Sequence, residues 1–168
     1  MSLFIMVYAK EERKMVFRMK ILVDADACPV KDIIERIAKE LEIQVIMLID
    51  TSHILTSSYS EIISISKAPD AVDFALINRT NKGDIVVTQD YGVAAMALGK
   101  GAYAIHQSGK VYTDNNIDQM LMERHIAKKK RRAGERVGGH AKKRTEGDDD
   151  RFADYFYQLC KKAENELI

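Results

Sequence analysis

Two patterns of apolar positions alternate along the chain from residue 20 onward. Short apolar runs rich in β-branched residues recur at intervals, and each is too short for a helix but long enough for a buried strand. These runs predict strands at 21–24, 43–49, 62–66, 84–88 and 103–106. Between them, apolar residues fall at the three- and four-residue spacing of an amphipathic helix. This second pattern predicts helices over 29–41, 70–77, 93–98, 116–132 and 150–167.

Residues at the ends of the predicted elements support these boundaries. Pro29 suits the first turn of a helix, Asn116 is expected to cap the helix that follows it, and Gly83 ends a turn before the fourth strand. A parallel crossover needs a connection of helix length, so strands alternating with helices predict a mostly parallel sheet covered on both faces. The expected fold is α/β, a single three-layer domain with about five strands and additional C-terminal helices.

The length and composition fit one globular domain. The chain has 168 residues, of which 46% are hydrophobic and 30% charged. Residues 1–18 show no clean period and are interpreted as an N-terminal extension of uncertain role, so the domain is expected at 19–168. No apolar run approaches the ~20 residues of a membrane span, and a signal-peptide pattern is absent. Because Cys28 and Cys160 lie far apart and form no disulfide framework, a cytoplasmic location is expected.

Positive charge is concentrated near the C-terminus. Of the 26 basic and 25 acidic residues, ten basic and one acidic lie within 124–144, which leaves 16 basic and 24 acidic residues for the remaining body. A basic loop is expected at 128–147, with Lys130, Arg131 and Arg132 as candidate contacts to a phosphate backbone. Nucleic acid is therefore the expected partner. The alternative interpretation is a solvated basic tail without a ligand.

Acidic residues follow the predicted strands one after another. In chain order they are Asp24, Asp26, Asp50, Asp70, Asp73, Asp90 and Asp114. Because parallel strands end at one edge of a sheet, these carboxylates are expected along a single rim. Each one alone fits a helix cap worth about 1 kcal/mol, but two carboxylates about 5 Å apart repel by roughly 3 kcal/mol. A cluster of them needs protons or a divalent cation, and oxygen ligands favour Mg²⁺ or Mn²⁺.

Four short motifs resemble a known family. They are DADACPVK at 24–31, DAVD at 70–73, VTQDYG at 87–92 and YTD at 112–114. In this order and spacing they resemble the YaiI/YqxD family of uncharacterised bacterial proteins, which is similar to PIN-like domains. The resemblance implies a PIN-like, Rossmann-like fold whose acidic cluster binds Mg²⁺ or Mn²⁺ and cleaves RNA. It implies that Asp24, Asp73 and Asp90 hold the metal, with Asp114 as a fourth candidate ligand.

The leading hypothesis is a metal-dependent phosphodiesterase, specifically an RNA-directed nuclease. Its catalytic residues are expected to be Asp24, Asp26, Asp73 and Asp90. Lys31 and Thr88 are candidate substrate contacts, although a solvated lysine and an ordinary strand threonine are the plainer interpretations. Cys28 is expected to be a small buried residue rather than a nucleophile.

Two rival hypotheses belong to different functional classes. An aspartate pair after the first strand also resembles the nucleophile and general acid of a haloacid-dehalogenase-like phosphatase, and a covalent aspartyl-phosphate on Asp24 would favour it. A non-catalytic RNA-binding protein would instead use its acids structurally. Equal RNA affinity in EDTA and in Mn²⁺, without cleavage, would favour that second rival.

Overall fold

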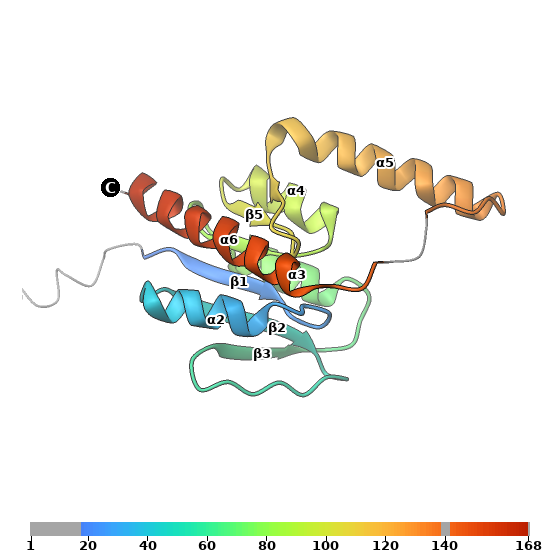
Figure 1. Cartoon of the computed structure of the whole chain (residues 1–168). Coiled ribbons are helices and arrows are strands. Elements are labelled where there is room, and N and C mark those ends of the chain that lie inside the picture. Colours follow the sequence, from blue (N-terminus) through green and yellow to red (C-terminus); the bar gives the residue numbers. More distant parts are fainter. Residues whose placement is uncertain (1–17, 139–141, 168) are drawn as a thin grey trace, which may run out of the picture.

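Five parallel strands form the centre of the fold. The computed structural model describes residues 18–138 and 142–167, whose strands form a sheet in the order β3-β2-β1-β4-β5-β6 (Figure 1). The strands are β1 (Lys20–Asp24), β2 (Gln44–Asp50), β3 (Glu61–Ile65), β4 (Ile85–Val87), β5 (Tyr103–Ile105) and β6 (Val111–Tyr112). Only β6 runs antiparallel to its neighbour, β5. Because the chain leaves β1 in one direction to β2 and later returns on the other side to β4, the carboxyl end of β1 is the switch point of the sheet.

Helices cover both faces of the sheet. They are α2 (Lys31–Glu40), α3 (Ala71–Arg79), α4 (Tyr91–Gly99), α5 (Asp114–Arg132) and α6 (Glu146–Glu166). Alternate residues of β1 point to opposite faces, so that Ile21 belongs to one apolar cluster and Leu22 to the other. The first cluster includes α2 and α6, where Phe152 and Phe156 stack with ring centroids 5.2 Å apart. The second includes α3, α4 and the first turns of α5.

The fold class expected from the sequence is confirmed. The structure is α/β with a mostly parallel sheet between helical layers, and each of the five predicted strands is present within about one residue of its expected position. β6 has no counterpart among the predicted strands, because two residues are too short to give a periodic signal. It pairs with β5 through a turn in which Gly109 has a φ of 89°. No helix in the described part of the chain has the length and apolar character needed to cross a bilayer.

Three helices begin earlier than their apolar pattern indicates, and two of them, α5 and α6, begin with a capping box. The cap of α5 is Thr113 rather than the expected Asn116, which occupies the third helical position and completes a capping box. In the same way, Thr145 caps α6 and pairs with Asp148, so this helix begins at Glu146 instead of residue 150. Polar first turns carry no hydrophobic signal, and this explains both differences.

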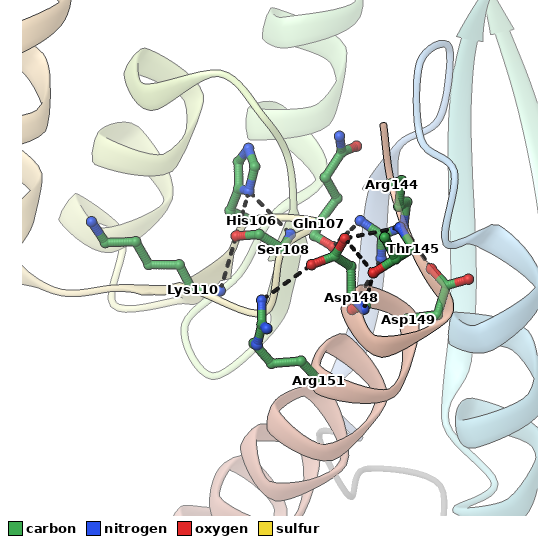
Figure 2. Close-up of polar contacts among 9 residues, drawn as sticks. All are labelled: His106, Gln107, Ser108, Lys110, Arg144, Thr145, Asp148, Asp149 and Arg151. Atoms are coloured by element: carbon green, nitrogen blue, oxygen red, sulfur yellow. Dashed lines mark hydrogen bonds and ion pairs between the residues drawn. The ribbon is translucent and has the colours of Figure 1, made fainter. Parts of the chain in front are cut away.

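The basic segment is divided between a helix and a loop. α5 continues through Arg132, so the first five residues of the expected 128–147 loop are helical. In the loop that follows, Arg144 donates to the Gln107 carbonyl at 2.9 Å and to the Asp149 carboxylate at 2.5 Å. Figure 2 shows these three residues side by side. Arg144 therefore anchors the chain to the β5–β6 turn and does not extend a solvated tail. Residues 139–141 of this segment, and all but Arg18 of the predicted N-terminal extension, lie outside the described residues.

Candidate active site

The carboxyl edge of the sheet contains two adjoining hollows that share Asp24 and Asp26. One, of about 530 Å³, is lined by Asp24, Asp26, Ala27, Gln89, Asp90, Tyr91 and Arg124. The other, of about 430 Å³, extends over the start of α3 and includes Asp50, Asp70 and Asp73. The structure thus brings six of the seven predicted rim aspartates to the same edge. Asp114 is exposed in the first turn of α5 and lines neither hollow.

Asp24 is the acid of this edge whose pKa is raised most. It ends β1, between β2 and β4, and burial together with the negative charges of Asp73, Asp26 and Asp90 raises the pKa of its carboxyl to about 6. Among the described residues, its side chain receives one hydrogen bond, a long one of 3.4 Å from the Thr88 hydroxyl. The surroundings of Asp24 therefore disfavour its ionised form relative to its protonated form.

Asp73 contributes a second poorly compensated carboxylate from the first turn of α3. Burial raises its pKa, and so do the charges of Asp90 and Asp70, while Arg124 acts in the opposite direction. Asp70, the residue before α3, has a left-handed φ of 59° and its side chain makes no capping hydrogen bond. The capping interpretation therefore does not account for the two acids of this segment.

Asp90 does fit the capping interpretation. Its Oδ1 accepts hydrogen bonds from the backbone amides of Gly92 at 2.7 Å and Val93 at 3.2 Å, at the start of α4. The same oxygen lies 3.3 Å from Nη1 of Arg124 on α5. Thr88 links this acid to Asp24, because its hydroxyl oxygen accepts from the Asp90 amide at 3.0 Å and donates to Asp24.

The tightest group of potential ligands is a different one, formed by Asp26, Asp50 and His53. Their ligand atoms all lie within 4.8 Å of one another, and no other group of three acids, histidines or cysteines in the described residues meets this limit. His53 Nδ1 is 3.1 Å from Asp26 and 3.2 Å from Asp50, and the Asp26 carboxylate also accepts from the Asp50 amide. A protonated His53 would hold the two carboxylates together without a metal.

The donor set of Asp24, Asp73 and Asp90 fits a hard divalent cation. Three carboxylates from three separate elements border the two hollows, and burial, together with the negative charges of neighbouring acids, raises the pKa of two of them, Asp24 and Asp73. Their oxygens are spread more widely than 4.8 Å. Mg²⁺ retains several waters and needs only one or two direct carboxylates, so a cation here would be held by one or two of these acids and by water.

The remaining predicted site residues have mixed surroundings. Lys31 donates to the carbonyls of Cys28 at 2.6 Å and Ala25 at 3.4 Å, so its ammonium holds the loop between β1 and α2. Thr88 is 2% exposed and acts on the acids instead of facing the hollow. Cys28 is buried, as expected, and burial raises its pKa. Lys130, Arg131 and Arg132 are exposed on the last turn of α5, which extends away from the sheet in Figure 1.

Two features of the site escaped the sequence analysis. The contacts of His53 with Asp26 and Asp50 depend on a loop whose course no period reveals. Arg124 had a detectable signal, since it follows Ile117, Met120 and Leu121 at helical spacing and so belongs to the face of α5 that packs on the body.

The fold and this edge define a class: an α/β protein with an acidic site at the switch point of a parallel sheet. The sequence model of the family described as "Uncharacterized BCR, YaiI/YqxD family" matches residues 22–162. The chain belongs to this family, as its four motifs indicate.

Curated relatives match most of the chain at high identity. A UPF0178 protein of Lachnoclostridium phytofermentans is 66% identical over 145 residues, which cover 85% of this chain and 97% of the relative. One from Clostridium acetobutylicum is 65% identical over 144 residues, covering 84% and 96%. One from Ruminiclostridium cellulolyticum is 60% identical over 131 residues, covering 78% and 86%. No solved structure is significantly similar to the chain.

Proposed function

We propose that this protein hydrolyses phosphodiester bonds in RNA, using a divalent cation bound by Asp24, Asp73 and Asp90. The observation that carries the proposal is the position of the Asp24 carboxyl, which lies at the switch point of the sheet, beside other acids and an open hollow. Its pKa is raised to about 6. A structural carboxylate normally accepts hydrogen bonds from several donors. A carboxylate that lacks such donors suits a site where a bound ligand supplies the positive charge.

Each residue of the acidic edge would have a separate role in the reaction. Asp24 and Asp73 would hold the cation, with Asp90 positioned by its amide bonds at the start of α4. Thr88 would orient Asp24. A Mg²⁺ or Mn²⁺ ion bound there supplies a Lewis acid that orients water and offsets the charge of the phosphoryl oxygens. Asp26 lines both hollows and would accept a proton from the attacking water.

The reaction balances as a hydrolysis. The water oxygen forms a bond to phosphorus as one phosphorus–oxygen ester bond breaks. One proton of the water passes through a carboxylate to the departing ester oxygen, which leaves as a hydroxyl group. The other remains with the new phosphate group or is released to solvent.

The last turn of α5 supports RNA as the substrate. Four of its residues are consecutive basic ones, Lys129 to Arg132, and they are exposed on the same helix that carries Arg124 into the acidic hollow. Basic side chains that neutralise phosphates give affinity without sequence preference, which matches a substrate read through its backbone. The PIN-like resemblance favours RNA over DNA.

The rival phosphatase hypothesis is weakened by one contact. A phosphate-binding threonine must present its hydroxyl to the ligand, whereas the Thr88 hydroxyl is buried between Asp24 and the Asp90 amide. The non-catalytic hypothesis predicts acids that are individually satisfied. Asp90 meets that description, and Asp24 does not.

The test is cleavage of labelled single-stranded and structured RNAs in Mn²⁺, in Mg²⁺ and in EDTA. We expect metal-dependent cleavage by the wild-type protein and its loss in Asp24→Asn, while Asp114→Asn, outside both hollows, retains it. Undiminished cleavage by Asp24→Asn would refute the assignment. A trapped phosphoryl group on Asp24 would transfer support to the phosphatase, and metal-independent RNA binding without cleavage to the binding protein.

A further inference from the structure

Arg124 is placed by its helix inside a hollow that is otherwise rich in carboxylates. It lies one turn beyond Met120 on the face of α5 that packs against α4, and its side chain borders the same space as Asp24, Asp26 and Asp90. A guanidinium has five N–H donors. One of its nitrogens lies 3.3 Å from Asp90 Oδ1, while the side chain remains 52% exposed, so the group is partly engaged and partly available.

The contact with Asp90 is weak as an ion pair. Asp90 Oδ1 already accepts two backbone amides, and an exposed pair at 3.3 Å contributes little stability. The guanidinium also lowers the pKa of Asp73, which places its positive charge near two of the three proposed ligands. Arg124 therefore occupies the position of a counter-ion for the acids of this edge.

We propose that Arg124 is the phosphate-positioning residue of the site and that it competes with the divalent cation for Asp90. Without a cation the guanidinium offsets the charge of the acids. Once a cation offsets that charge, the donors of Arg124 are available to a phosphate oxygen in the same hollow, in the forked geometry that arginine provides. This inference rests on the proposed function, because it assumes that the acids bind a cation.

The competition between Arg124 and the cation can be tested by measuring binding affinities, without an assay of enzymatic activity. We expect Arg124→Gln to bind Mn²⁺ about three- to tenfold more tightly than the wild-type protein in calorimetric titration, because a competing positive charge is removed. Binding of inorganic phosphate to the Mn²⁺-loaded protein should weaken about tenfold in the same variant. Arg124→Lys keeps the charge but loses the fork, so it should retain wild-type Mn²⁺ affinity and lose part of the phosphate affinity.

A matched control is available on α3. Arg79 is exposed at the far end of that helix and donates to the Ala75 carbonyl, so Arg79→Gln removes the same charge without altering the hollow. Mn²⁺ and phosphate affinities in Arg124→Gln equal to those in Arg79→Gln would overturn the inference. If the wild-type protein binds Mn²⁺ normally and only the Arg124 effects are absent, the proposed function stands. If the wild-type protein binds no Mn²⁺, both proposals fall.

Discussion

An aspartate lies at each end of β1, and the two differ in how completely hydrogen-bond donors satisfy them. At the amino end, Asp84 is 4% exposed at its side chain and accepts from the Lys20 amide at 3.0 Å, the Lys20 ammonium at 2.7 Å and the Asn81 amide at 2.8 Å. At the carboxyl end, Asp24 receives one long hydrogen bond and faces other acids. A buried aspartate whose donors are complete stabilises the fold, whereas a half-buried one whose donors are missing indicates a site.

The largest effect on the free energy of unfolding should come from Asp84, at the amino end of β1. Asp84→Asn leaves the Lys20 ammonium, whose side chain is 17% exposed, without its counter-charge. We expect a loss of about 3 kcal/mol in the free energy of unfolding, measured by urea denaturation at pH 7.5. Mn²⁺ affinity of the folded fraction should be unchanged. A loss below about 0.5 kcal/mol would remove the contrast between the two ends.

The same substitution at the other end should act in the opposite direction. The pKa of Asp24 in the folded protein is about 6, above the unfolded value of 3.8, so its ionisation opposes folding. Stability is highest below the unfolded pKa and is lost as the pH rises through 6. After allowance for solvent screening, Asp24→Asn should stabilise the metal-free protein by about 1–2 kcal/mol at pH 7.5.

The pH dependence supplies the control for that prediction. The stability difference between Asp24→Asn and the wild-type protein should shrink as the pH is lowered from 7.5 toward 4, since the wild-type carboxyl becomes protonated in the folded state. A difference that stays constant over this range would mean that the ionisation of Asp24 is not opposed by its surroundings.

A smaller effect is expected at the residue that links two acids of the site. Thr88→Val preserves the buried shape but removes the acceptor of the Asp90 amide and the donor to Asp24. The free energy of unfolding should fall by about 1 kcal/mol. The pKa of Asp24, followed by NMR titration of its carboxyl carbon, should rise further, because the lost hydrogen bond lowers it. An unchanged pKa would show that this bond is not formed in solution.

The smallest effect on stability should come from the tip of α5. Replacing Lys130, Arg131 and Arg132 together by Gln should change the free energy of unfolding by less than about 0.5 kcal/mol, because all three are exposed. The salt dependence of RNA binding should change instead. If all three contact phosphates of a single strand, the slope of log affinity against log salt should decrease by about 2. An unaltered slope would return these residues to the solvated-tail interpretation.

Much of the architecture could be predicted because it depends on periodic patterns. The β-branched runs locate β1 to β5, and the rule that parallel strands end at one edge correctly brings Asp24, Asp26, Asp73 and Asp90 together. β6 and the first turns of α5 and α6 leave no hydrophobic signal, because their residues are few or polar.

The finer chemistry of the site depends on contacts that the sequence does not encode locally. Asp90 is a helix cap and Asp24 is not, although both follow strands. The contact between His53 and Asp26 depends on the path of a loop. The hydrogen bond that Lys31 donates to a nearby carbonyl depends on how the chain turns after β1. Such differences arise from tertiary placement, which residue type and spacing alone do not determine.

The most direct measurement is calorimetric titration of Mn²⁺ into the metal-free wild-type protein, Asp24→Asn, His53→Gln and Asp114→Asn at pH 7.5. We expect saturable binding by the wild-type protein, loss of binding in Asp24→Asn, and retained binding in His53→Gln and Asp114→Asn. Loss of binding in His53→Gln with full binding in Asp24→Asn would contradict it, because the cation would then belong to Asp26, Asp50 and His53. Absence of binding by the wild-type protein would contradict it as well.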